Sequence, residues 1–286
     1  MQTRYEPNRV GWIKEQYNRL FYMNIVKNID NVGRVTPNSL ILGNCLDVMP
    51  LIESGSVDAI ICDPPYGWGT TACKWDSVID FDLMWEQLNR VIKPNSAIVL
   101  FGSEPFSSAL RMSNIKNYKY DWVWDKHIPR NFANAKRMPM NKHEMISVFN
   151  CKGNYYPQMI LRDKPVTVKN YAKKGKDSSY KMNQDGSNQK TYTYTHKNPD
   201  TIIVGKWMAN KGKQHPTQKP VALMEYLINT YTNENETVLD FTMGSGTTML
   251  ACKNLNRNGI GIENDEGYFK IAQQRINKID TEPKLF

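Results

Sequence analysis

The loop Asp63-Pro64-Pro65-Tyr66 combines residue types that could hold an aromatic amine for reaction. The nitrogen lone pair of such an amine is normally delocalised into its ring. The Asp63 carboxylate and the Pro64 carbonyl could each accept one N–H bond and so free that lone pair. Pro65 has no N–H, which keeps the Pro64 carbonyl out of regular pairing, and the two prolines stiffen the loop. Tyr66 adds a ring on which a planar substrate could stack.

A second candidate site is the glycine-rich turn from Asp240 to Thr248, which contains Gly244 and Gly246. Glycines between a strand and a helix let the backbone pass close to a ligand, beside the positive end of the helix. Such turns also occur without a ligand. Glu263 ends the next predicted strand, however, where a carboxylate can accept both hydroxyls of a ribose. The glycine-rich turn and Glu263 together therefore favour a nucleoside cofactor. No lysine follows the turn in the position of a P-loop lysine, which disfavours ATP chemistry.

Both loops require strands and helices to position them. Short apolar runs typical of strands buried on both faces alternate with stretches at helical spacing. This alternation predicts an α/β fold with a doubly wound, mostly parallel sheet, and both loops lie at its carboxyl edge. The expected strands are 39–42, 58–62, 97–101, 120–124, 145–149, 237–240 and 259–263. The expected helices are 81–92, 222–231, 247–256 and 266–279.

The chain divides into four regions by composition. Residues 39–150 and 207–286 are two halves of one α/β domain, which carry the Asp-Pro-Pro-Tyr loop and the glycine turn respectively. Residues 151–206 lose the α/β pattern, and we expect irregular structure and short strands there. Residues 1–38 form a basic, aromatic extension that is expected to be helical between residues 12 and 28.

The positive charge of the chain is concentrated in one segment. The chain has a formal net charge of +9. Residues 151–214 hold 13 Lys or Arg and 4 Asp, so this segment alone accounts for the excess. A flexible, solvated insertion would also be basic. Interleaved aromatic residues favour a nucleic-acid surface instead, because cations neutralise phosphates while rings stack on bases. These aromatic residues are Tyr155, Tyr156, Tyr171, Tyr180, Tyr192, Tyr194 and Trp207.

Other features limit the class of protein. No apolar run approaches the roughly 20 residues of a membrane span, and the first 20 residues lack the apolar core of a signal peptide. No membrane association is therefore expected. The five cysteines contain no Cys-x-x-Cys pair, which indicates reduced thiols in a cytoplasm and no zinc site.

The order of these motifs resembles that of the amino-methylating DNA methyltransferases, specifically their permuted beta group. Members carry Asp-Pro-Pro-Tyr first, then a target-recognition region, then the cofactor glycine motif, as this chain does at 63–66, 151–206 and 240–248. The resemblance covers roughly residues 39–280. The stretch from Asp63 to Trp85 is most similar to phage-borne and prophage members.

Two further segments carry the resemblance. His215-Pro216-Thr217-Gln218-Lys219-Pro220 resembles the family motif that precedes the glycine strand. Gly43-Asn44-Cys45-Leu46 resembles the family turn that contacts the cofactor adenine, with Asn44 in place of the usual Asp. An amide oxygen can still accept a bond from adenine N6, and Asp47 is the alternative acceptor. Family members also usually have Asp-Pro-Phe where this chain has Asp240-Phe241-Thr242.

The resemblance implies transfer of a methyl group from S-adenosylmethionine to adenine N6 in double-stranded DNA, with no metal. The extruded adenine would be held by Asp63, Pro64, Pro65 and Tyr66. It would meet the cofactor across neighbouring strand ends. The residues assigned to the cofactor are Asn44, Asp63, Thr217, Lys219, Asp240, Phe241, Thr242, Gly244, Ser245, Gly246, Thr247 and Glu263.

Three alternatives stay open at this point. The target amine could be cytosine N4 instead of adenine N6. The acceptor could be RNA or a protein, although such enzymes usually place the glycine motif before the Pro-Pro-Tyr loop. The chain could also be a catalytically idle DNA-binding homologue. A homodimer is left open because beta-group members are frequently dimers. Carbon-5 methylation is disfavoured because no cysteine follows a proline.

Overall fold

The computed structural model describes residues 23–27, 33–67, 76–169, 191–204 and 218–277. The chain forms two compact units, and each is described by itself. The smaller unit is Pro157–Asp200, and the larger one holds the rest.

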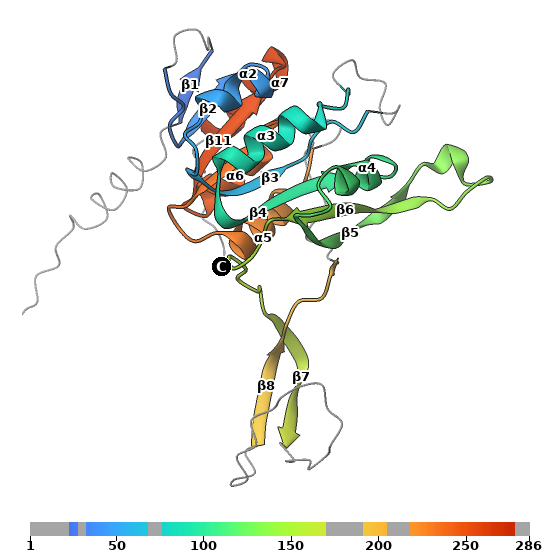
Figure 1. The fold of residues 1–286 in the computed structure, drawn as a ribbon. Coiled ribbons are helices and arrows are strands. Elements are labelled where there is room, and N and C mark those ends of the chain that lie inside the picture. The colour runs from blue at the N-terminus through green and yellow to red at the C-terminus, as the bar shows by residue number, and fades with distance from the viewer. Residues whose placement is uncertain (1–22, 28–32, 68–75, 170–190, 205–217, 278–286) are drawn as a thin grey trace, which may run out of the picture. The chain divides into compact units, whose positions relative to one another are not determined.

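The larger unit contains a nine-stranded sheet in the order β1-β2-β11-β10-β3-β4-β6-β5-β9 (Figure 1). Neighbouring strands from β1 to β4 run parallel, β6 is antiparallel to β4 and β5, and β9 is parallel to β5. The strands are β1 (Asn24–Val26), β2 (Ser39–Leu42), β3 (Val57–Cys62), β4 (Ile92–Gly102), β5 (Tyr118–Arg130), β6 (Asn141–Phe149), β9 (Ile202–Ile203), β10 (Thr237–Asp240) and β11 (Asn258–Glu263). The mostly parallel α/β sheet that the sequence predicts is confirmed.

Helices cover both faces of this sheet, so its central strands are buried along their whole length. Every residue of β3 and β10 is buried. The helices α5 (Val221–Tyr231), α6 (Thr247–Asn254) and α7 (Glu266–Asn277) share one apolar core with one face. The short helix α2 (Cys45–Val48) and the helices α3 (Phe81–Val91) and α4 (Phe106–Ser113) share the other core. A one-turn 3-10 helix, η2 (Met49–Leu51), follows α2.

The strand order reverses between β3 and β10. These two strands are parallel neighbours, with Val238 opposite Ala59 and Leu239 opposite Ile60. From β10 the chain passes through α6 to β11 on one side, and from β3 it passes through α3 to β4 on the other. The crevice outside the carboxyl ends of such a pair is where open α/β sheets bind ligands. The Asp-Pro-Pro-Tyr loop follows β3 and the glycine turn follows β10, so both open into this crevice.

The prediction of a helix between residues 12 and 28 is wrong at its carboxyl end. Residues 24–26 form strand β1, which pairs with Ser39–Ile41 of β2. The Asn24 amide also donates to the Asn38 carbonyl at 2.7 Å. Pairing with the open edge of the sheet outweighs local helical spacing here. Residues 12–22 lie outside the described part of the chain.

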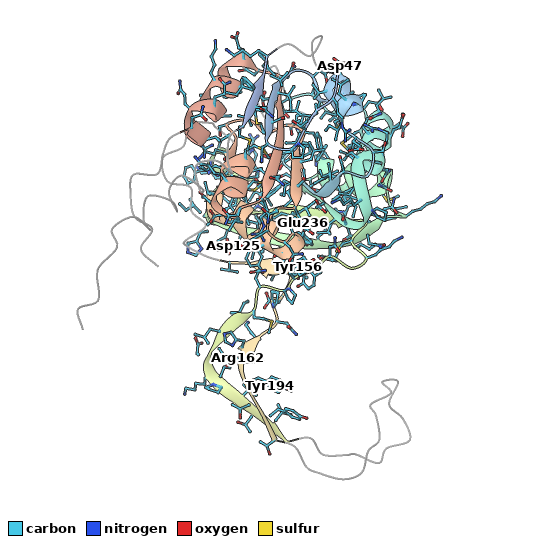
Figure 2. All side chains as sticks on the ribbon, turned by 90° about the vertical axis from the view of Figure 1, so that its left-hand side faces the viewer. Asp47, Asp125, Tyr156, Arg162, Tyr194 and Glu236 are labelled. Carbon is cyan, nitrogen blue, oxygen red and sulfur yellow. The ribbon has the colours of Figure 1, made fainter. Side chains whose placement is uncertain are left out.

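The smaller unit is a two-stranded antiparallel hairpin of β7 (Ile160–Lys169) and β8 (Thr191–Lys197). Irregular structure with short strands was expected, so the ten-residue β7 corrects that expectation. Alternating threonine and tyrosine residues in β8 favour extended backbone. The rings of Tyr192 and Tyr194 stack at 6.4 Å between centroids. Arg162 of β7, visible with Tyr194 in Figure 2, donates from Nε to the His196 carbonyl at 3.1 Å.

Candidate active site

Asp63 lies at the carboxyl end of β3, and both of its carboxylate oxygens have partners within the chain. The Tyr66 hydroxyl donates to Asp63 Oδ1 at 2.6 Å. The Lys219 ammonium donates to Asp63 Oδ2 at 2.6 Å. A carboxylate offers about four lone-pair positions. Asp63 can therefore keep both partners and still accept a bond from a substrate amine.

Lys219 belongs to a buried row of charges that alternate in sign. Its Nζ lies 3.2 Å from Glu144 Oε2, in addition to its contact with Asp63. Glu144 on β6 also pairs with Lys126 on β5. The Lys219 side chain is only 8% exposed. Burying a charge costs several kcal/mol unless it is paired, so the row is stable only as a unit.

Burial and ion pairing have opposite effects on the pKa values of these charged groups. Burial raises the pKa of Asp63 above its ordinary value, and Lys219 limits the rise. Burial would also raise the pKa of Glu144, but Lys219 and Lys126 outweigh it and hold that pKa below its usual range. Burial would lower the pKa of Lys219, but the two carboxylates outweigh it and raise that pKa. Lys219 is therefore a permanent cation beside Asp63.

Tyr66 packs closely against the core. Its ring stacks on Phe106 with centroids 5.1 Å apart, and Lys219 Nζ lies 5.9 Å from the ring centroid. Burial, followed by the charge of Asp63, raises the pKa of the Tyr66 hydroxyl well above its ordinary value, which keeps it a donor. A substrate base would have to use the ring face that Phe106 leaves, so stacking on Tyr66 stays a prediction. The assignments of Pro64, which is buried, and of half-buried Pro65 also stay predictions.

The two glycines of the second loop have different surroundings. Both have positive φ, +54° at Gly244 and +75° at Gly246. A Cβ added at Gly246 would lie 2.8 Å from the Ala272 Cβ, because α6 packs closely on α7 there. A Cβ added at Gly244 would meet nothing within 4 Å. Gly246 therefore serves packing, whereas Gly244 lies where a ligand could approach the backbone.

The buried Asp240 side chain is hydrogen bonded to both ends of the glycine turn. It is buried, and its Oδ2 accepts from the Thr248 hydroxyl at 2.5 Å while its Oδ1 accepts from the Thr242 amide at 3.2 Å. Burial raises the pKa of Asp240 to about 6. Phe241 is 1% exposed and lies in the core on the α2, α3 and α4 side. The structure thus places both residues beneath the turn, where only their main chain could reach a cofactor.

Glu263 lies half-buried at the end of β11, against the glycine turn. Its Oε2 accepts from the Gly244 amide and its Oε1 from the Asp265 amide, each at 2.8 Å. Burial raises the pKa of Glu263 above its ordinary value. Each oxygen retains a lone pair that a ribose hydroxyl could use.

Three other predicted cofactor residues are hydrogen bonded within the chain. The Asn44 Oδ1 accepts from the Leu46 amide at 3.0 Å and so caps α2, while the Asn44 side chain stays exposed. Arg275 Nη1 donates to the Ser245 hydroxyl at 2.8 Å and to the Thr247 hydroxyl at 3.1 Å. Thr217 lies outside the described residues.

The motifs converge at the crevice. The Thr242 hydroxyl donates to the Asp63 carbonyl at 3.1 Å and lies 3.0 Å from Cys62 Sγ, so it joins the glycine turn to the Asp-Pro-Pro-Tyr loop. The Ser245 hydroxyl contacts Gln218 Oε1 at 3.4 Å, one residue before Lys219. Segments distant in sequence therefore lie on one site. Across the described ranges, His, Cys, Asp and Glu side chains form no group that could hold a metal ion.

Sequence reasoning missed Glu144 and Lys126. Glu144 begins the apolar part of β6, and nothing in its local sequence distinguishes it from a solvated charge. Only the pairing of β5 with β6, with Trp124 opposite Glu144, shows that it enters a buried site.

Residues 57–274 match the family model described as DNA methylase, which covers N6 and N4 methyltransferases. The chain belongs to the N6/N4 DNA methylase family. It is thus a DNA methyltransferase.

This methyltransferase is similar to type II methyltransferases of two Haemophilus species. It is 29% identical to M.HpaI of Haemophilus parainfluenzae over 256 residues, which cover 83% of this chain and 74% of M.HpaI. It is 27% identical to M.HinfI of Haemophilus influenzae, over 86% of this chain and 70% of M.HinfI.

Solved structures show the same fold. The structure of the M1.HpyAVI–SAM complex matches with a TM-score of 0.54 and 28% identity, over 83% of this chain and 98% of that one. The cytosine-N4-specific PvuII DNA methyltransferase matches with a TM-score of 0.58 over 86% and 89% of the chains, but at 14% identity. Within the described residues, no helix combines the length and apolar character needed to cross a membrane.

Proposed function

We propose that this chain methylates adenine N6 in double-stranded DNA with S-adenosylmethionine, as a member of the permuted beta group. The observation that carries the proposal is the position of Asp63. Its carboxylate lies at the switch point of the sheet, and its main chain is hydrogen bonded to the glycine turn through Thr242 at 3.1 Å. An amine held by Asp63 would therefore face a ligand held by that turn.

The residues around the turn fit such a cofactor. Open space beside Gly244 would admit a ligand next to the backbone. Glu263 retains acceptor capacity at the strand end where a ribose would lie. The structure of the M1.HpyAVI–SAM complex, which matches 83% of this chain at 28% identity, supports the same cofactor here. When bound, S-adenosylmethionine would supply a sulfonium methyl group that an amine lone pair can attack.

The chain's own residues would prepare the amine. Asp63 must be ionised to accept its N–H bond, and the fixed charge of Lys219 opposes the protonation that burial favours. Tyr66 donates to Asp63 Oδ1 and so fixes the carboxylate plane. The nitrogen loses one proton after transfer, and Asp63, with a pKa raised by burial, is placed to receive it before water does.

Adenine is favoured over cytosine by the first residue of the loop. In the family that the chain resembles, members with Asp at that position mostly modify adenine, and members with Ser mostly modify cytosine. Asp63 is the residue here. Cytosine N4 is the second candidate.

The order of motifs supports the permuted group and a recognition role for the insertion. The catalytic loop at 63–66 precedes the glycine turn at 240–248, with residues 151–206 between them. Within that insertion, the hairpin of β7 and β8 exposes Tyr192 and Tyr194 beside basic residues such as Arg162. Cations and exposed rings on one hairpin suit phosphates and bases.

The test is transfer of tritiated methyl groups to DNA, RNA and protein in parallel. We expect incorporation into double-stranded DNA alone, and nucleoside analysis of the product should give N6-methyladenine. N4-methylcytosine would establish the second candidate. Incorporation into RNA or protein without DNA would refute the proposal.

A further inference from the structure

The strands β5 and β6 extend beyond the sheet that contains the site. The last pair between β6 and β4 joins Met145 to Gly102, at the carboxyl edge of the parallel strands. Beyond that edge β5 and β6 pair only with each other, through Asp125–His143 to Arg130–Asn141. Figure 1 shows their light-green ends reaching past the neighbouring strands. We call residues 127–141 the arm.

The root of the arm is connected to the catalytic carboxylate. Lys126 on β5 directly precedes the arm, and Glu144 on β6 follows it by three residues. These two side chains form an ion pair at the root of the arm. Glu144 then contacts Lys219 at 3.2 Å, and Lys219 contacts Asp63 at 2.6 Å. Three ion pairs in series therefore join Lys126, at the start of the arm, to Asp63. The arm leaves the sheet at its carboxyl edge, where a substrate would enter.

The arm carries positive charge without any acid. Arg130, Lys136 and Arg137 are exposed, and residues 127–141 contain neither Asp nor Glu. None of the three is ion paired with a carboxylate of the described residues. The net charge of the chain does not show this local excess, because acidic residues outside the arm offset it. Three exposed cations on one hairpin are suited to phosphates.

The arm also exposes apolar side chains at its tip. Phe132 is 82% exposed and Ile128 is 71% exposed. Phe132 begins a short 3-10 turn, η3 (Phe132–Asn134), that is ordered by Asn131, with φ +70°, and by a 2.9 Å bond from Asn134 Nδ2 to Asn131 Oδ1. An ordered turn thus presents a ring that has no packing partner within the sheet. Proteins that distort duplex DNA insert apolar wedges of this type between bases.

We infer that the arm is a second DNA-contacting element, separate from the insertion at 151–206. It rests on the proposed function in one respect, namely that the target base leaves the duplex. Arg130, Lys136 and Arg137 bind phosphates next to the target, and Phe132 enters the stack that the extruded base leaves. A protein partner would suit the apolar side chains, but it would leave three cations without matching anions.

The phosphate contacts are tested by the salt dependence of DNA binding. The variant Arg130→Gln/Lys136→Gln/Arg137→Gln is compared with the wild type on a 30-base-pair duplex. Each lost phosphate contact reduces the slope of log K against log salt by about 0.9, so the slope should fall by about 2–3. This test requires no methyl transfer, so it stands even if the proposed activity fails. An unchanged slope would overturn the assignment of the cations.

A control removes charge at the opposite edge of the sheet and outside the insertion at 151–206. Lys116 and Lys119 are exposed on either side of Asn117, whose carbonyl accepts a 2.8 Å main-chain hydrogen bond from Asn150 near the amino end of β5. The variant Lys116→Gln/Lys119→Gln should keep the wild-type slope. An equal loss of slope per removed charge in the arm variant and in this control would mean a diffuse charge effect and would overturn the proposal.

The wedge is tested by Phe132→Ala on two duplexes that carry the mapped target site. On the fully paired duplex we expect kcat/KM to fall about 5- to 160-fold, the range of one lost base-stacking contact. On a duplex with an abasic site opposite the target base, extrusion is already eased and most of the loss should disappear. The control Ile115→Ala removes another exposed apolar side chain and should change neither rate. Equal losses of Phe132→Ala on both duplexes, or no loss, would overturn the wedge.

Discussion

Lys219 Nζ lies 2.6 Å from Asp63 Oδ2, although 156 residues separate them in sequence. Asp63 comes from the loop after β3, and Lys219 stands just before α5. This pair joins two sequence motifs into one site and sets the charge of the group that would hold the target amine.

Replacement of Lys219 should change the pH dependence of methylation. In Lys219→Met, burial of Asp63 is no longer opposed by a cation, so the pKa of Asp63 rises further. Because the ionised form is required, the acid limb of the kcat/KM profile should move to higher pH. Lys219→Arg, which keeps the charge, should move the limb less. If the acid limb of Lys219→Met stays in place while activity falls, Lys219 does not act by keeping Asp63 ionised.

Glu144→Gln should destabilise the protein and weaken catalysis together. Gln keeps the shape but leaves Lys219 and Lys126 short of one negative charge in a buried site. Loss of one partner of a buried ion pair costs about 3 kcal/mol of unfolding free energy. In urea unfolding, the double variant Glu144→Gln/Lys126→Met should lose less unfolding free energy than the two single variants lose in sum. Additive losses would show that the row of charges is not a unit.

Gly244 and Gly246 of the glycine turn should respond differently to replacement by alanine. At Gly246 the positive φ and the 2.8 Å approach to the Ala272 Cβ should together reduce unfolding free energy by about 2–4 kcal/mol. At Gly244, where space is open, only the positive φ counts, at about 1 kcal/mol. Calorimetric titration should nevertheless show the greater loss of S-adenosylmethionine affinity in Gly244→Ala. The reverse order of affinities would remove Gly244 from the site.

Asp240 should make the protein less stable as pH rises from about 4 to 6. Its folded pKa, raised by burial to about 6, exceeds the ordinary 3.8, so the folded state binds the extra proton in this range. Stability is therefore greatest below the ordinary value and declines until the pH passes the folded value. The decline is about 3 kcal/mol for two pKa units. The difference in unfolding free energy between wild type and Asp240→Asn should show this slope, and a flat difference would exclude it.

Most of the fold could be predicted from the sequence because its signals are local. Strand β2 and strand β10 have the predicted bounds, since apolar runs between turns mark a strand that is buried on both faces. The outer parts of β5 and β6 could not be found in this way. Those parts are solvated on both faces, so no apolar period marks them, and Pro129 and Pro139 resemble loop residues.

The site could be predicted only where a motif carried it. Asp63 and Lys219 stand in recognisable motifs, but their contact depends on the order of strands in space. Glu144 and Lys126 have no motif, and their role depends on cross-strand register alone. The cap made by Asn44 and the burial of Phe241 likewise follow from packing around α2 and β10, which no spacing in the sequence shows.

The most direct test of the central claim is methyl transfer to double-stranded DNA by Asp63→Ala, with S-adenosylmethionine affinity measured on the same preparation. The Asp63 side chain would hold the amine, whereas Gly244 and Glu263, which are hydrogen bonded to each other, would line the proposed cofactor site. We expect the variant to bind S-adenosylmethionine within about a few-fold of wild type and to lose transfer by at least about 100-fold. A variant that still methylates DNA at a rate near that of the wild type would contradict the account.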